Sequence, residues 1–573
     1  MSTTNYCTTL TREEDAVVAV ASAGSSSALL TNSSTGSSSS SSCFSGNIVS
    51  RNLVDPHRKK VHHPSRINGI QNTGSTKTYN YRESFEKVPF FTAVFTHFGF
   101  YILMFLGYIN QLLFAPIVAK EQGRKGYAPL YNNFEQFYLR YVYRRIKDCW
   151  NRPICSVPGS TVTLKDRKTN DHGWTFEFTG SKTKCINLGS YNYMGFAESS
   201  GPCAQESIQA LKKYGCASGS SRLELGSMPI HDELERLLAR FLGVEDAIVF
   251  GMGFATNTLN IPSLFSKGCL VMSDAKNHAS LILGLRLSDV TIRVFKHNNL
   301  KHLEDNLKKA IVSGQPGTGE PWKKIVIVVE GIYSMEGTVV HLPELLEIKK
   351  KYKAYLYLDE AHSIGAMGKR GRGVCDYYGV DPKEVDILMG TFTKSFGSAG
   401  GYIAGSKALI NYLRIYSHAH TYAVAMSPPI AQQIITSMKL IAGEDGTDAG
   451  KKRTRSLARN TKYFRRRLNQ IGVITHGHED SPVVPMMVYF FSKISAVVRA
   501  LTARNIATVG VGFPATPLYE GRIRFCLSAA HTKEQLDYVL DNIEEISNEL
   551  GLKYSKKRRS STPIEYYSDS EPE

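Results

Sequence analysis

Short apolar runs alternate with helical segments through the central part of the chain. Segments with helical periodicity, such as 232–242 and 343–352, lie between the runs. Buried strands that alternate with helices form a mostly parallel sheet covered on both faces. The pattern therefore predicts an α/β domain. The apolar runs that we interpret as its strands are 247–250, 270–273, 325–330, 355–359 and 387–390.

The pattern changes on both sides of this domain. After residue 427, long helical stretches and the separate strand-like runs 483–489 and 522–527 indicate a smaller α+β unit. A serine-rich start and a basic-then-acidic end bury too little apolar surface to fold, so we predict disorder there. The expected organisation is a disordered tail (1–80), a membrane-associated helix (85–120), a linker or N-terminal region (121–180), a large domain (181–426), a small C-terminal domain (427–552) and a disordered tail (553–573).

One segment, 88–118, contains no Lys, Arg, Asp or Glu. About 20 apolar residues suffice to cross a bilayer core, so this segment predicts a membrane helix. A buried helix of a soluble domain is the alternative. Basic residues occur on both flanks, so the positive-inside rule does not decide the orientation. Whether the helix spans the membrane or lies in its surface stays open at this point.

Composition limits the class of protein. The chain has 573 residues and a net charge of +18. The basic excess is dispersed and no zinc-finger or RNA-binding signature occurs, which favours a membrane surface over nucleic acid. The ten cysteines are scattered without a CxxC pair, which favours a reducing compartment. No secretory signal pattern opens the chain.

The strongest chemical signal is a lysine in a turn. Lys394 follows the run 387–390 in Gly-Thr-Phe-Thr-Lys-Ser-Phe-Gly, and Asp359 ends the run before it. A lysine can form a Schiff base with pyridoxal phosphate while an aspartate pairs with the pyridine nitrogen. The Thr391 and Thr393 hydroxyls suit a phosphate oxygen. The alternatives are a solvated lysine and an Asp-Glu helix cap.

Three further positions suit the same cofactor. His278 follows the run 270–273 and could stack on the ring, and His362 could reach its phenolic oxygen. Gly253 and Phe254 lie in a glycine loop that opens a helix, where backbone N–H groups can cradle a phosphate. A GxG without a third glycine is weak support for a dinucleotide site.

Two arginines point to substrate binding. Arg522 and Arg524 alternate on a predicted strand, so both face the same side. At least one could clamp a substrate carboxylate; surface ion pairing is the alternative.

These motifs resemble the α-oxoamine synthases, which are fold-type I pyridoxal phosphate enzymes. The resemblance covers about 85–554 and, within that family, is closest to long-chain-base catalytic subunits. The Lys394 turn, 359–362, 277–280 and 524–532 carry it, with further matches at 150–158, 189–193, 295–299, 330–337 and 511–517.

The resemblance implies condensation of L-serine with palmitoyl-CoA to 3-ketosphinganine, CoA and carbon dioxide. It implies that Lys394 holds the cofactor and removes the Cα proton, that His278 stacks on the ring, and that Asp359 stabilises the carbanion. His362 would tune the phenolic oxygen, and Thr391 with the Gly253 loop would hold the phosphate. Arg524 would then meet the substrate carboxylate.

The resemblance also implies a heterodimer with a lysine-less long-chain-base subunit 1, small regulatory subunits, and an endoplasmic reticulum membrane location with a cytosolic catalytic domain. One departure occurs at 424–426, Val-Ala-Met, where the family often has Ser or Thr. A related synthase using glycine or alanine and a non-catalytic subunit remain alternatives. A dehydrogenase has weaker support.

Overall fold

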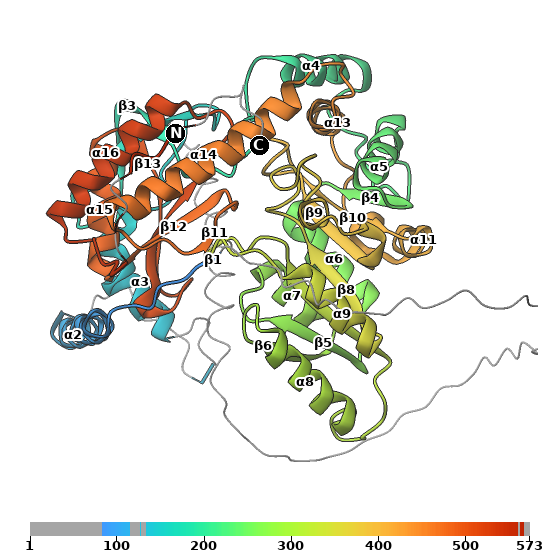
Figure 1. The fold of residues 1–573 in the computed structure, drawn as a ribbon, viewed down its shortest axis with the longest axis horizontal. Helices are drawn as coiled ribbons and strands as arrows, with labels where there is room; N and C mark the ends of the chain where they lie inside the picture. The colour runs from blue at the N-terminus through green and yellow to red at the C-terminus, as the bar shows by residue number, and fades with distance from the viewer. Residues whose placement is uncertain (1–82, 115–125, 128–132, 558, 560–561, 567–573) are drawn as a thin grey trace, which may run out of the picture. The chain divides into compact units, whose positions relative to one another are not determined.

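The computed structural model describes residues 83–114, 126–127, 133–557, 559 and 562–566 (Figure 1). The tail predicted to be disordered at 1–80 and the end of the apolar segment lie outside the described residues. Within the described chain, a seven-stranded sheet forms the centre of the α/β domain. Its order is β4 (Asp246–Phe250), β10 (Gly401–Gly405), β9 (Ile387–Thr391), β8 (Tyr355–Asp359), β7 (Lys324–Glu330), β5 (Cys269–Asp274) and β6 (Thr291–Phe295).

The sheet is parallel except for β10, which runs antiparallel to both of its neighbours. Successive residues of β4 belong to different apolar clusters, Ile248 to one and Val249 to the other. Both faces are therefore covered, which confirms the mostly parallel α/β fold. The surrounding helices are α4 (Pro202–Tyr214), α5 (Pro229–Leu242), α6 (Gly253–Leu264), α7 (Ala279–Leu287), α8 (Leu300–Ser313), α9 (Leu342–Tyr352), α10 (Val374–Tyr378), η3 (Pro382–Glu384), α11 (Lys407–Tyr416), α12 (His418–Tyr422) and α13 (Pro428–Ala442).

The C-terminal part contains two small three-stranded sheets. One has the order β12 (Val483–Tyr489), β15 (Gly521–Cys526), β14 (Val509–Val511). In the other, β13 (Ile506–Ala507) pairs with β3 (Glu177–Asn187), which pairs with β2 (Thr161–Lys168). The β2–β3 hairpin, which precedes the large domain in sequence, thus shares a sheet with the C-terminal part. The helices of the C-terminal part are α14 (Ala449–Ile471), α15 (Phe491–Ala503), η4 (Leu518–Glu520) and α16 (Lys533–Glu549).

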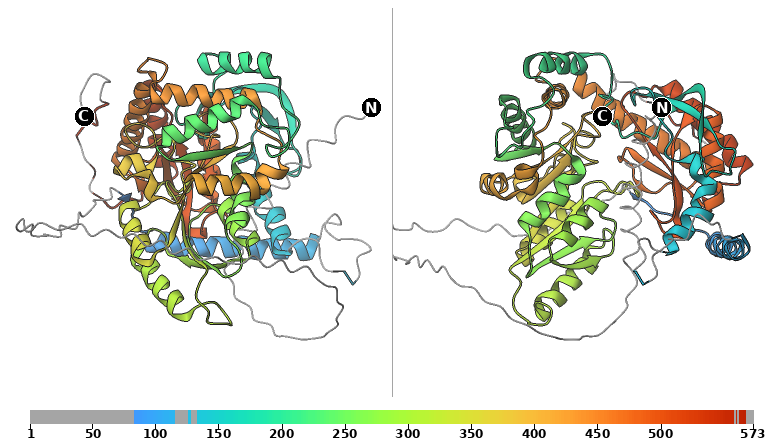
Figure 2. Two further views of the ribbon diagram at one scale, coloured as in Figure 1. Left: turned by 90° about the vertical axis from the view of Figure 1, so that its right-hand side faces the viewer. Right: turned by 180° about the vertical axis from the view of Figure 1, so that it is seen from behind.

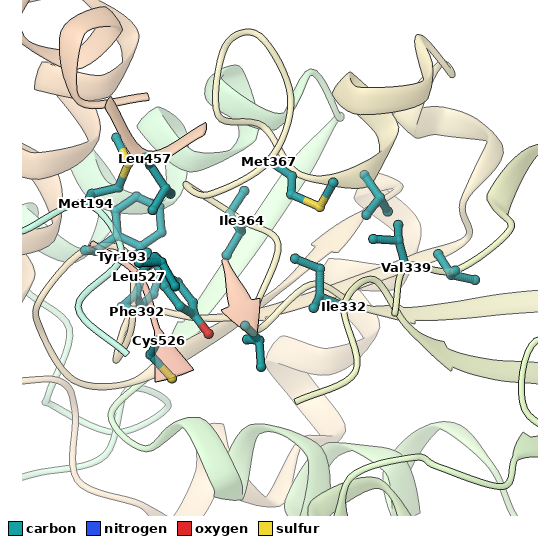
Figure 3. Packing of buried hydrophobic residues seen from close by; sticks show 14 of the residues in the cluster. Tyr193, Met194, Ile332, Val339, Ile364, Met367, Phe392, Leu457, Cys526 and Leu527 are labelled. Carbon is teal, nitrogen blue, oxygen red and sulfur yellow. The ribbon is translucent and has the colours of Figure 1, made fainter. Parts of the chain in front are cut away.

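A continuous apolar cluster links the C-terminal part to the turn after β9. Figure 3 shows Phe392, from that turn, beside Tyr193 and the β15-end residues Cys526 and Leu527. All four side chains are buried. The turn that carries Lys394 therefore rests on packed side chains, which limits its motion.

The N-terminal elements are β1 (Glu83–Ser84), α2 (Phe90–Phe114), α3 (Asn133–Tyr141) and η2 (Tyr143–Cys149). β1 pairs antiparallel with β11 (Gly477–His478), and the Glu83 carboxylate accepts from the Val339 N–H at 3.3 Å. The strand β1 therefore contacts both the C-terminal part and the large domain. Figure 2 shows α2 and the neighbouring α3 beside the C-terminal part.

Helix α2 is long and apolar enough to cross a membrane over Phe90–Leu113, judged by length and composition alone. Most of its large side chains are exposed, including Phe105 and Leu112. On its packed side, a Cβ at Gly107 would lie 2.8 Å from the Phe137 ring, so glycine permits the close approach of α3. A soluble core helix would be mostly buried, so the exposed apolar side supports membrane association.

The described part of the predicted C-terminal tail makes defined contacts. Tyr554 lies edge-on to Tyr489 with centroids 5.2 Å apart, and the Tyr566 hydroxyl donates to Asn460 Oδ1 at 2.7 Å. Residues 567–573 lie outside the described chain.

Candidate active site

The carboxyl ends of four parallel strands place titratable side chains along one edge of the large sheet. Asp274 ends β5, Glu330 ends β7 and Asp359 ends β8, while Lys394 lies in the turn after β9. In the sheet register Glu330 pairs with Asp359. Ligand sites of open α/β sheets occur at this edge, so the motifs predicted from sequence converge at a suitable place.

Lys394 is half-buried in this edge. Its Nζ donates to Thr391 Oγ1 at 3.4 Å and lies 5.8 Å from the Tyr191 ring centroid. The surrounding protein desolvates the ammonium group and lowers the pKa of Lys394, although the carboxylates of Asp359 and Glu330 oppose the shift. A lysine with a lowered pKa supplies more neutral amine at physiological pH.

Asp359 is buried and held by directed hydrogen bonds. Asn257 Nδ2 donates to Asp359 Oδ2 at 2.9 Å, and the Ala361 N–H donates to Oδ1 at 2.9 Å. The Tyr357 hydroxyl donates to Asn257 Oδ1 at 2.7 Å, which fixes the amide orientation. The carboxylate therefore has a fixed position at the carboxyl end of β8.

His278 caps the N-terminus of α7. The Ser280 N–H donates to its Nδ1, so Nδ1 accepts and the neutral ring carries its proton on Nε2. The ring is solvent-accessible, but the surrounding protein desolvates its cationic form and lowers the pKa of His278. Phe254 meets the ring edge-on with centroids 6.0 Å apart. A neutral, laterally supported imidazole suits stacking on an aromatic ligand.

His362 is buried behind Tyr191. Its Nδ1 lies 2.8 Å from the buried Tyr193 hydroxyl, and that hydroxyl has no other hydrogen bond among the described residues. Burial and the nearby cations of Lys394 and Arg524 hold the pKa of His362 well below its usual range.

The predicted phosphate cradle lies where α6 begins. Gly253 is the first residue of α6, and the first N–H groups of a helix attract anions. A Cβ at Gly253 would lie 3.0 Å from Thr391 Cγ2 and 3.2 Å from the Gly400 carbonyl oxygen. Glycine thus lets the helix start approach the Thr391 hydroxyl. A buried lysine amine, a fixed carboxylate and this cradle together fit pyridoxal phosphate.

The structure separates the two arginines of β15. Arg522 is saturated, because it donates to the Glu520 carboxylate and to the Met335 carbonyl, both at 2.8 Å. Arg524 lies 4.7 Å from the Tyr191 centroid, and its buried Nε has no hydrogen-bond partner among the described residues. A buried guanidinium donor without a partner is suited to a ligand carboxylate.

Sequence reasoning did not assign Glu330 to the site. Its Oε1 accepts from the His278 N–H at 2.5 Å. Complete burial and the neighbouring Asp359 raise the pKa of Glu330 well above its usual value. In the sequence, the feature that could have indicated this role is the position of Glu330 at the end of a predicted strand.

Comparisons with known proteins agree with this geometry. The description "Aminotransferase class I and II" matches residues 183–543. Serine palmitoyltransferase 3 of Homo sapiens is 53% identical over 84% of this chain and 89% of its own length. Serine palmitoyltransferase 2 of Caenorhabditis elegans is 53% identical over 81% of this chain and 82% of its own length.

Solved structures give the same result. The Sphingomonas wittichii serine palmitoyltransferase superposes with a TM-score of 0.64 at 27% identity. The match covers 74% of this chain and 99% of that protein. A second serine palmitoyltransferase structure, described with a pyridoxal phosphate internal aldimine, has a TM-score of 0.63 at 26% identity and covers 74% of this chain and 100% of its own.

Proposed function

The chain belongs to the serine palmitoyltransferases, within the class I and II aminotransferase family, and from this premise we propose that it condenses L-serine with palmitoyl-CoA. The products are 3-ketosphinganine, CoA and carbon dioxide, as in the first step of sphingolipid synthesis. The convergence of Lys394, Asp359 and His278 at one sheet edge carries the proposal, because a non-catalytic subunit does not need all three.

Pyridoxal phosphate, when bound, supplies an aldehyde that links to amines and a ring that withdraws electrons from Cα. The residues that would hold it are Lys394, Asp359 at the ring nitrogen, His278 on the ring face, His362 near the phenolic oxygen, and Thr391 with Gly253 and Phe254 around the phosphate.

The remaining chemistry belongs to the side chains. Lys394, with its lowered pKa, accepts the Cα proton of serine at Nζ. The Cα electron pair attacks the thioester carbonyl, the carbon–sulfur bond breaks, and the thiolate of CoA leaves. The serine carboxylate is lost as carbon dioxide, and the electron pair left on Cα takes up a proton. Arg524 orients that carboxylate through its unpartnered Nε.

A heterodimer with a lysine-less long-chain-base subunit is supported by an exposed apolar surface at the start of α6. Residues of three segments form it, since the Leu223 N–H donates to the His420 carbonyl and Ser221 bridges to Val424. Large apolar side chains exposed there are Leu223, Leu225, Met252, Tyr422 and Val424. Exposed apolar patches mark interfaces, so a related subunit would complete the site. Small regulatory subunits remain part of the proposal by family resemblance.

Attachment to the endoplasmic reticulum membrane is proposed from the exposed apolar α2 and the water-insoluble acyl chain. The catalytic domain would then be cytosolic.

The test is an acceptor and chain-length assay on the full chain co-expressed with its expected partner subunit. Serine, glycine and alanine are each supplied with acyl-CoA of several lengths. We expect product from serine and palmitoyl-CoA only when both subunits are present. A preference for glycine or alanine, or full activity of the chain alone, contradicts the proposal.

A further inference from the structure

Three alternate positions between the turn of the β2–β3 hairpin and the start of β3 carry aromatic rings. Trp174, Phe176 and Phe178 follow one another there, and each ring lies beneath a cation. Arg144 Cζ lies 4.4 Å from the Trp174 centroid and Arg167 Cζ lies 4.3 Å from that of Phe176. Lys165 Nζ lies 5.7 Å from the Phe178 centroid. We call these three ring–cation pairs the aromatic–cation ladder.

The ladder is held rigidly but left open. Arg167 Nη2 donates to the carbonyl oxygens of Lys147 at 3.1 Å and Trp150 at 2.7 Å, which fixes the middle of the hairpin to η2. The outer rings are not part of a core, because Trp174 is 46% and Phe178 61% exposed. Large rings left in solvent on a fixed scaffold mark a binding surface.

The hairpin also sorts its charges between two faces. In the register, Arg167 lies opposite Phe178, and Lys165 lies over the same ring across a shift in the register, so these three residues share one face. Asp166 falls on the alternate face, where its carboxylate accepts from the Ser181 hydroxyl at 2.8 Å. The aromatic face therefore carries positive charge without a neutralising carboxylate from these strands.

Contacts connect the ladder to the apolar helix α2. At the hairpin tip, a Cβ at Gly173 would lie 2.5 Å from the Arg144 carbonyl oxygen of η2. The chain runs directly from α3 into η2, and Phe137 of α3 stacks on Tyr108 of α2 with centroids 4.1 Å apart. The hairpin tip is thus linked to the apolar helix α2 through η2 and α3.

We propose that the aromatic–cation ladder docks onto anionic lipid headgroups beside α2. Rings of this kind favour the membrane–water interface, and clustered cations beside a membrane segment attract anionic lipids. A nucleic acid fits less well, since the ring faces on which bases would stack already carry cations. The ladder depends on the membrane attachment by α2 proposed above.

The test uses tryptophan quenching, because the chain contains three tryptophans, Trp150, Trp174 and Trp322. The full chain and its partner subunit are reconstituted into proteoliposomes whose lipids carry bromine near the headgroup. We expect quenching that grows with the phosphatidylserine content of the vesicles. The signal should disappear in Trp174→Phe and persist in the matched control Trp322→Phe.

Two further variants sharpen the outcome. Each cation removed from an anionic surface weakens the attraction by about fivefold, so Lys165→Gln and Arg144→Gln should each require more phosphatidylserine for the same quenching. Unquenched Trp174 in vesicles that retain the chain overturns the ladder alone. A chain absent from floated vesicles overturns the α2 attachment and the ladder with it. Loss of the partner subunit from these variants identifies a protein interface and also contradicts the proposal.

Discussion

Two regions of the protein distribute polar and apolar side chains in opposite ways. The carboxyl edge of the large sheet buries Asp359, Glu330 and Arg524, whereas α2 exposes Phe105 and Leu112. Burying charge costs free energy unless partners compensate, and exposing large apolar surface costs free energy in water. Each region is therefore complementary to something outside the chain: a charged ligand at the sheet edge and a lipid phase around α2. Substitutions in one region should leave the function of the other intact.

The largest expected effect is at Lys394. Replacing it by alanine should reduce product formation by at least about 10³-fold, because both the cofactor attachment and the Cα base are lost. The purified complex should also lose the visible absorption band of the lysine-bound cofactor. Membrane flotation should be unchanged, and the surface variant Lys439→Ala should behave as wild type. An unchanged band in Lys394→Ala would disprove the assignment.

Arg524 should give the next largest effect. Arg524→Gln removes a charged hydrogen-bond donor worth roughly 1.5–3 kcal/mol, so the KM for serine should rise by about 10- to 100-fold. The KM for palmitoyl-CoA should stay within twofold, or about the error of the assay. If Arg524→Gln alters the acyl-CoA KM and leaves that of serine unchanged, the carboxylate assignment is wrong.

Substitutions of Glu330 test whether its side-chain oxygen positions His278. Glu330→Gln keeps the carbonyl acceptor for the His278 N–H, so activity should stay near wild type, while Glu330→Ala should lose about tenfold. Cofactor affinity, measured by fluorescence titration, should weaken only in the alanine variant. A large loss in Glu330→Gln would mean that the ionised carboxylate is needed.

Wild type and Glu330→Gln should also differ in how their stability depends on pH. The pKa of Glu330 is raised in the folded state, so its contribution to stability is present at low pH and is lost as pH rises through the folded pKa. Glu330→Gln removes this loss. Its unfolding midpoint should therefore fall less than that of wild type as pH rises above the ordinary glutamate pKa.

The smallest effect on chemistry is expected in α2. Phe105→Asp places a charge on the exposed side at a cost of about 3 kcal/mol in a bilayer centre, so the complex should float less with membranes. In detergent, kcat should be almost unchanged. Phe105→Leu is the matched control and should remain attached. Loss of kcat in detergent together with normal flotation would contradict the separation of the two regions.

Local patterns predicted much of this molecule. The five apolar runs each coincide with a strand of the large sheet, because a buried parallel strand needs an uninterrupted apolar stretch. The antiparallel β10 and the pairing of β13 with β3 were not predicted, since strand direction and contacts between distant segments leave no local trace. Sequence placed both Arg522 and Arg524 on one side of a strand. Only the packed structure shows that Arg522 is saturated and Arg524 keeps a free donor.

The role of Glu330 illustrates the same limit. From the sequence, a glutamate at the end of an apolar run is expected to be a surface carboxylate. Its neighbour Asp359 belongs to a different strand, so the sequence does not show that the two residues are close. The raised pKa of Glu330 follows from burial and from the pairing with Asp359. The assignments of His278, His362 and Thr391 remain predictions that binding measurements can test.

The pairing of β1 with β11 has a consequence for how the chain is made. Synthesis begins at the N-terminus, so β1 and the adjacent helix α2 leave the ribosome long before Gly477 and His478 exist. The helix can enter the lipid phase while β1 is still unpaired, before β11 has been synthesised. Closing this strand pair is thus among the last folding events, and it joins the first described residues to a body that has already formed at the membrane.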